Sequence, residues 1–152
     1  MTTAGGDPPT TVTVLPTMDL DQEATWHALL ELAEARPRDW CLIGGQMVAL
    51  HAYEAGREPP RLTTDGDLVI DIRAAQDALK SITGVLLARG FTEDGVSPEE
   101  VGHRYVRGRA VLDVLLPEGV GERRRRVTAT GARTIQAAGT TQALERAELT
   151  GV

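Results

Sequence analysis

Residues 61–71 read RLTTDGDLVID, and two aspartates, Asp65 and Asp67, stand two positions apart at the start of its apolar run. Side chains alternate between the two faces of a β-strand, so these carboxylates share a face, about 7 Å apart along the backbone. Hard divalent cations prefer oxygen ligands, and an ion held by a few carboxylates can still coordinate the phosphates of a substrate. The stretch therefore predicts a strand that carries two candidate metal ligands.

Two further features extend this prediction. Upstream, Gly44 and Gly45 stand where an apolar run ends and a helical pattern begins. Downstream, Asp113 lies inside a second apolar run, AVLDVLL at 110–116. A carboxylate within an apolar strand is costly unless it is paired or bound to a metal. Together, the glycine turn and the three carboxylates indicate a metal-dependent site that handles nucleotides.

The remaining patterns define the order of the elements. A helix capped by Asp19 or Asp21 is expected to end near Ala35, and Gly44-Gly45 is expected to form a turn. Further helices are predicted over 46–55 and 74–89, and strands over 39–43, 62–72, 91–93, 103–106, 110–116 and 142–149. This order predicts an α/β (α+β) fold with a mixed β-sheet flanked by helices on one side. Residues 1–10 are expected to be a disordered lead-in, and residues 11–152 a single domain.

The composition of the chain limits the classes of protein to which it can belong. The chain has 152 residues, a net charge of −6 and one cysteine, Cys41, inside an apolar run. A disulfide framework is excluded within one chain, and the acidic balance argues against a general nucleic-acid coat. No apolar stretch approaches the roughly 18 residues that a membrane span requires, and the N-terminus has no signal-peptide pattern. A reducing cytoplasm is the expected location.

The run IGGQMVALH at 43–51, followed by Arg61-x-Thr63-x-Asp65-x-Asp67-Leu68, resembles the nucleotidyltransferase-fold proteins of the polymerase-beta superfamily. Within that superfamily it is most similar to the abortive-infection, type IV toxin-like group, the AbiEii family. The resemblance covers roughly residues 25–150, and it implies a nucleotidyltransferase fold. Because the chain stops without a closing helix, we expect it to be the first part of a larger protein that possesses the family's helical C-terminal half.

The resemblance also implies roles for individual residues. Gly44 and Gly45 would let the backbone approach the nucleotide phosphates at the start of the next helix. Asp65, Asp67 and Asp113 would hold two Mg²⁺ (or Mn²⁺) ions, with Asp113 also helping to take the proton from the nucleophile. The implied reaction transfers a nucleoside monophosphate from a nucleoside triphosphate (NTP) to an acceptor hydroxyl of a tRNA or a protein. A toxin–antitoxin or phage-defence setting, with a cognate antitoxin, follows from the same resemblance.

Several residues depart from the family pattern or leave alternatives open. The family's usual Gly-Ser is Gly-Gly here, and Gly66 replaces an aliphatic residue, so it is expected to pack against nothing and to add flexibility. Arg61 and Thr63 are candidate nucleotide-binding residues, although Arg61 could instead pair with a carboxylate. Four arginines at 123–126 could contact an RNA backbone or simply be solvated.

Alternatives also remain for the carboxylates and for the function. Asp65 and Asp67 could lie on a solvated edge strand, and alternation could place Asp113 toward solvent. The protein could be an inactive remnant of the fold that binds a nucleotide or a partner. A third alternative is an active nucleotidyltransferase whose acceptor is a small molecule, an antibiotic. Uncovered terminal strands would favour a homodimer.

Overall fold

The computed structural model describes residues 11–94, 103–119, 128–131 and 136–152. The lead-in expected at 1–10 and the arginines at 123–126 lie outside these ranges. None of the described helices has the length and apolar character needed to cross a membrane.

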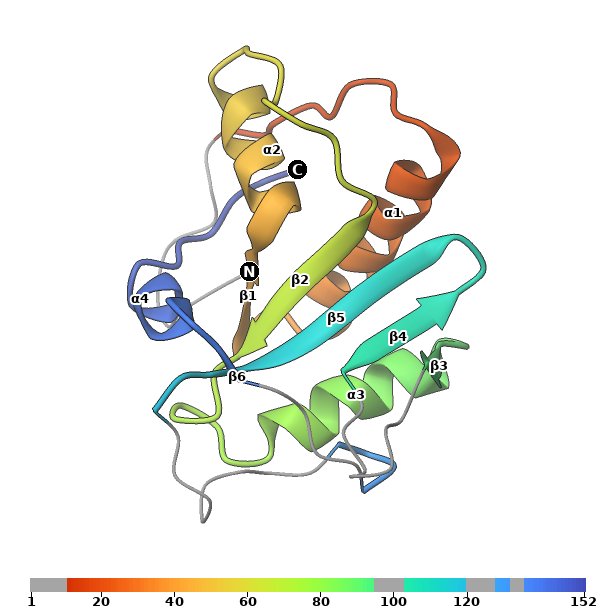
Figure 1. The fold of residues 1–152 in the computed structure, drawn as a ribbon, viewed down its shortest axis with the longest axis vertical. Helices are drawn as coiled ribbons and strands as arrows, with labels where there is room; N and C mark the ends of the chain where they lie inside the picture. The colour runs from red at the N-terminus through yellow and green to blue at the C-terminus, as the bar shows by residue number, and fades with distance from the viewer. Residues whose placement is uncertain (1–10, 95–102, 120–127, 132–135) are drawn as a thin grey trace.

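In the described part of the chain, helices and strands alternate as far as α3, and strands β3 to β6 then precede α4 (Figure 1). The helices are α1 (Leu20–Ala35), α2 (Gly44–Glu54), α3 (Ala78–Ala88) and α4 (Thr140–Glu145). The strands are β1 (Trp40–Ile43), β2 (Asp65–Ile70), β3 (Thr92–Asp94), β4 (Arg104–Arg107), β5 (Ala110–Pro117) and β6 (Gln136–Ala137).

The strands form one mixed sheet in the order β1-β2-β5-β4-β3, with β6 paired to the end of β5. At its centre β2 and β5 run parallel, whereas the β1–β2, β4–β5 and β3–β4 pairs are antiparallel. Strands β2 and β5 can run parallel because α3, β3 and β4 lie between them in the chain and return β5 in the same direction. The predicted mixed α/β fold is confirmed.

Helix α1 begins where its sequence predicts. The side chain of Asp19 accepts hydrogen bonds from the backbone amides of Asp21 and Gln22, so Asp19, rather than Asp21, is the N-cap. The helix buries Trp26 and Leu29 against the sheet, and Trp40 of β1 is also fully buried. The two tryptophans are therefore core residues.

Helices cover both faces of the sheet, although the sequence predicted one. Leu68 and Ile70 of β2 point into the main core, which α1 and α3 cover. Val69 points the other way and packs with Cys41 and with Leu144 of α4. Alternation along β2 explains this division, because its last three residues are all apolar and require cover on both faces.

The last helix corrects a second prediction. Residues 142–149 were expected to be a strand, but α4 occupies Thr140–Glu145, directly after Gly139 in the left-handed region at φ +77°. The segment is rich in Gln, Ala, Leu, Glu and Arg, and these residues favour helices more than strands. The argument for a homodimer through uncovered terminal strands therefore loses its premise.

Three boundaries also differ from the prediction. Gly44 and Gly45 form the first turn of α2 rather than a separate turn. Helix α3 begins at Ala78 instead of residue 74, because residues 72–77 form turns, the first of them capped by Asp71, which accepts from the amide of Ala74. Strand β2 begins at Asp65 rather than near residue 62.

Candidate metal centre

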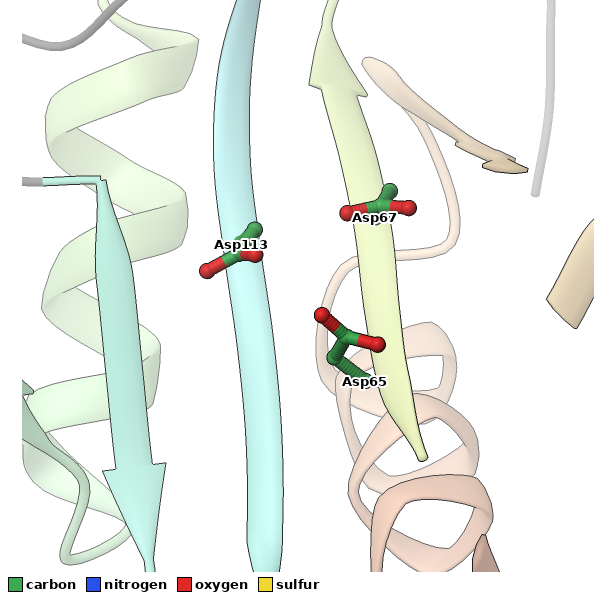
Figure 2. Close-up of side chains that lie close together, drawn as sticks. All are labelled: Asp65, Asp67 and Asp113. Carbon is green, nitrogen blue, oxygen red and sulfur yellow. The ribbon is translucent and has the colours of Figure 1, made fainter. Parts of the chain in front are cut away.

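Asp65, Asp67 and Asp113 meet on one face of the sheet. In the parallel β2–β5 pair, Asp67 lies directly opposite Asp113, and Asp65 lies opposite Val111 on the same face. Each carboxylate offers an oxygen within 4.8 Å of the others, and among the described residues this is the one group of acidic, histidine or cysteine side chains that could hold a metal ion. Figure 2 shows the three side chains on their two neighbouring strands. The sequence prediction that these residues converge is confirmed.

The electrostatics of this triad fit a cation. Asp113 is buried, with 7% of its surface exposed, and Asp65 and Asp67 are partly buried. Burial, together with the negative charges of Asp65 and Asp113, raises the pKa of Asp67 to about 6. Like charges on adjacent strands repel one another, so a divalent ion bound among the three oxygens would relieve an existing cost. The donor set, three carboxylates and no sulfur or imidazole, suits Mg²⁺ or Mn²⁺.

Arg104 of β4 neutralises part of this charge. Its Nε donates to Asp113 Oδ1 at 2.8 Å and its Nη2 donates to Asp113 Oδ2 at 2.7 Å. The same Nη2 also reaches Asp65 Oδ2 at 3.3 Å. These hydrogen bonds raise the pKa of Arg104 further above its ordinary value, so the guanidinium stays charged. If all three carboxylates are ionised, the cluster retains two negative charges after Arg104 is counted.

A buried polar network holds the segment that leads into β2. Gln46 of α2 donates to the carbonyl of Thr63 at 2.8 Å and accepts from the indole of Trp26 at 3.0 Å. Gln22 donates to the same carbonyl at 3.2 Å. The Thr63 hydroxyl donates to the carboxylate of Asp65 at 3.2 Å. Through these contacts α1 and α2 fix the position of the first ligand.

A second connection joins α1 to both ligand-bearing strands. The hydroxyl of Thr25, fully buried, donates to the carbonyl of Thr64 at 2.7 Å and accepts from the amide of Val111 at 3.2 Å. One side chain thus bridges the segment before β2 and the part of β5 that precedes Asp113. Buried polar groups whose hydrogen bonds are all made tend to make the surrounding region rigid.

The two glycines at the start of α2 leave room for Asp67 and Thr63. Gly44 has φ +69°, and a Cβ there would collide with the carboxylate of Asp67, whose Cγ would be 3.1 Å away. A Cβ at Gly45 would collide with the side chain of Thr63. Only glycine lets the backbone pass this close to Asp67 and Thr63. The pattern that the sequence linked to phosphate binding therefore has a structural role beside the carboxylates.

Gly66 corrects another expectation. Its position between the aspartates faces α1, and a Cβ there would lie 3.0 Å from Leu112 Cδ2 and 3.3 Å from Thr25 Cγ2. The residue thus allows α1 to approach the sheet closely, instead of leaving a flexible gap. An aliphatic residue at this position would not fit against this helix without displacement.

Arg61 and the glycines border one surface hollow. A cavity of about 390 Å³ is lined by Gly44, Gly45, Met47, Val48, Pro60 and Arg61. Arg61 is exposed and makes no ion pair with a described residue, so the carboxylate pairing that the sequence left open is not formed.

A second cavity, of about 360 Å³, lies between β1, α2 and α4. Cys41 borders it, and burial raises the pKa of this thiol to about 11, as expected for an inert cysteine.

Sequence reasoning missed Arg104, Gln22 and Gln46. Arg104 could have been found from the predicted hairpin, because a two-residue connection at Gly108-Arg109 places residue 104 opposite Asp113. The glutamines gave no such signal, since a polar residue in an amphipathic helix is read as exposed.

The three carboxylates could together hold a hard divalent ion. Its ligands come from rigid central strands, and an open hollow lies next to the glycines that border Asp67. Comparisons with protein-family models, with curated proteins and with solved structures find no match for this chain.

Proposed function

We propose that this protein is a metal-dependent nucleotidyltransferase, which transfers a nucleoside monophosphate from an NTP to an acceptor hydroxyl. The observation that carries the proposal is the carboxylate triad on two parallel strands, directly beside a helix start that must be Gly-Gly. The resemblance of residues 43–51 and 61–68 to the nucleotidyltransferase-fold family supports the same reaction. It also suggests a tRNA end or a protein side chain as the acceptor.

In the proposed reaction, the acceptor oxygen attacks the α-phosphorus, the bond to the bridging oxygen breaks, and pyrophosphate leaves. Asp65, Asp67 and Asp113 would hold Mg²⁺ or Mn²⁺, which would stabilise the charge that develops on the attacking and leaving oxygens. Gly44 and Gly45 would let the triphosphate approach the N-terminal amides of α2, where anions are favoured. Arg61 stands at the rim of the same hollow and supplies a positive charge for the phosphates.

The hydroxyl proton requires an acceptor. Asp113, the residue that the family resemblance assigns to this role, already accepts from Arg104 through both of its oxygens. The carboxylate of Asp67 receives no hydrogen bond from any described residue, so an oxygen that does not bind the metal would be open to this proton. We therefore assign proton acceptance to Asp67 in the proposed reaction.

The test is the transfer of label from each α-³²P NTP into bulk tRNA and into a protein lysate, with Mg²⁺ or Mn²⁺. Wild type is compared with the Asp65→Asn/Asp67→Asn double variant. The control is Asp77→Asn, which removes one negative charge from an exposed position at the N-cap of α3, outside the triad. We expect label with wild type and the control, and none with the double variant.

The same assay identifies the base and the class of acceptor. Label in RNA would support the tRNA hypothesis, and label in protein would support protein modification. Equal label with wild type and the double variant would refute the role of the triad. Absence of label in every arm would reject transfer to either class and would favour a module that binds a nucleotide or a partner without catalysis.

A further inference from the structure

Three charged residues stand side by side across β3, β4 and β5. Asp94 is paired with Arg104, and Arg104 is paired with Asp113, in consecutive antiparallel strand pairs. Directly paired residues point to the same face of a sheet, so the guanidinium is flanked by a carboxylate on each side. Asp94 is exposed, whereas Asp113 is buried. The negative charge of Asp94 also contributes, after those of Asp113 and Asp65, to the raised pKa of Arg104.

In this row of three residues, the guanidinium of Arg104 lies on the side of Asp113. Its Nη2 lies 2.7 Å from Asp113 Oδ2 and 3.3 Å from Asp65 Oδ2, and so bridges two of the three candidate ligands. In Figure 2 one oxygen of Asp113 points toward β4, while Asp65 and Asp67 each turn an oxygen toward β5. The side chain of Arg104 is 41% exposed, so its outer part is free to move into solvent.

A divalent ion and this guanidinium compete for the same oxygens. Mg²⁺ binds carboxylate oxygens at about 2.0–2.1 Å, so an ion on Asp65 and Asp113 would stand close to the present position of Nη2. Two cations at that separation repel each other strongly in a partly buried site. Since Asp94 offers a second carboxylate on the opposite flank, the side chain has another partner that is exposed and on the same face.

We propose that Arg104 is the resident counter-ion of the metal-free triad, and that it leaves Asp65 and Asp113 for the side of Asp94 when a divalent ion binds. This inference rests on the proposed function, because it takes the triad as the metal site. It adds a competition that sets the metal affinity, and it explains how the acidic cluster is accommodated without a metal.

The test is Mn²⁺ affinity, measured by calorimetry on the full chain. Arg104→Gln is expected to tighten binding about tenfold, the equivalent of one charge-assisted hydrogen-bonded pair of about 1.4 kcal/mol. Arg107→Gln is the matched control, because it removes the same charge from the same strand but pairs with Glu31 of α1 on the other face. We expect its affinity to stay within about twofold of wild type.

A substitution of Asp94 provides a second test of the proposed movement. Asp94→Asn is expected to weaken binding about threefold in the wild type, partly because the displaced guanidinium loses its alternative partner. In the Arg104→Gln background the same change is expected to have a smaller effect. Equal effects in both backgrounds would show that Asp94 acts on the ion directly and would overturn the proposed movement.

A spectroscopic measurement on unmodified protein keeps the inference testable even where a variant folds poorly. The Nε–H resonance of Arg104, assigned by its loss in Arg104→Lys, is followed by NMR during a Mg²⁺ titration. We expect it to shift and to exchange faster with solvent as the bond to Asp113 breaks. An unchanged resonance at saturating Mg²⁺, or weaker Mn²⁺ binding by Arg104→Gln, would show that Arg104 orients Asp113 instead and would refute the proposal.

The outcomes also separate this inference from the proposed reaction. Competition without label transfer would support the counter-ion and reject the transferase. Equal Mn²⁺ affinity in wild type and Arg104→Gln would reject the counter-ion and leave the transferase standing. Absence of Mn²⁺ binding in both proteins would reject both.

Discussion

Replacing Asp67 by asparagine is expected to stabilise the metal-free protein at neutral pH. The pKa of Asp67 is about 6 in the folded chain, against an ordinary value of 3.8. The fold therefore favours the protonated form, and ionising the group destabilises it. The shift corresponds to about 3 kcal/mol at most, and because Asp67 is partly exposed, solvent screening reduces this to about 1–2 kcal/mol. Asparagine removes the charge with little change in shape.

The pH dependence fixes the sign of this effect. Below about pH 4 the carboxyl is protonated in both states and contributes nothing. As the pH rises from 4 to 6, the unfolded chain ionises first, so wild type loses stability relative to the variant. Above pH 6 the full difference is present. The advantage of Asp67→Asn should therefore be largest at pH 7.5 and should shrink at pH 4.5.

The assay is urea denaturation in EDTA at pH 7.5 and pH 4.5, together with thermal unfolding, where a gain of about 3–6 °C is expected. Asp77→Asn is the control, because it removes an aspartate at the N-cap of α3 that makes no side-chain cap, and asparagine is an equally good N-cap residue. Adding Mn²⁺ should stabilise wild type and not the variant. If Asp67→Asn is equal to or less stable than wild type in EDTA at pH 7.5, the claim that this charge destabilises the fold is wrong.

Three further substitutions test how the site is built. Gly66→Ala should destabilise the protein by about 1–3 kcal/mol in urea denaturation, because its methyl would press against Leu112; unchanged stability would contradict the close approach of α1. Gly44→Ala should cost about 1–2 kcal/mol for its left-handed backbone and should weaken Mn²⁺ binding by displacing Asp67; normal affinity would show that the glycine is not needed there. Gln46→Met should cost about 1–3 kcal/mol, because it leaves a buried indole without its acceptor, and an unchanged unfolding midpoint would exclude this role.

Most of the fold could be predicted because its patterns are local. Asp19 caps α1 through a hydrogen bond within three residues, and the hairpin of β4 and β5 turns at Gly108, where the sequence places it. Helix α4 was predicted as a strand because it is short and its apolar residues fit either period, although the composition of the segment favours a helix. Its position on the second face of the sheet depends on Cys41 and Val69, which the pattern identifies only as buried.

The site was predictable for the same reason, up to a limit. Alternation within one strand predicts that Asp65 and Asp67 share a face. Asp113 was identified because a carboxylate within an apolar strand is costly unless it is paired or bound to a metal. Their meeting requires β2 and β5 to be parallel neighbours, which the sequence does not state. Gly66 was misinterpreted, because a glycine that accommodates a helix and one that loosens a strand look identical until α1 is placed.

The three carboxylates of the triad differ in the hydrogen bonds that they accept, and this difference leads to a last prediction. Arg104 bonds to Asp113 and Asp65 but makes no hydrogen bond or ion pair to Asp67, so Asp67 carries the charge that is least compensated. A cation that binds to the triad must take this carboxylate in its ionised form, and near pH 6 about half of the molecules must release a proton. Calorimetry with Mn²⁺ at pH 6, in two buffers of different ionisation enthalpy, should therefore detect release of about half a proton per site, and almost none at pH 8. Asp67→Asn, which is expected to lose Mn²⁺ binding, should give no buffer-dependent binding heat. If wild type shows no buffer dependence at pH 6, Asp67 is already ionised without the metal, and the repulsion inferred among the three carboxylates is weaker than the structure indicates.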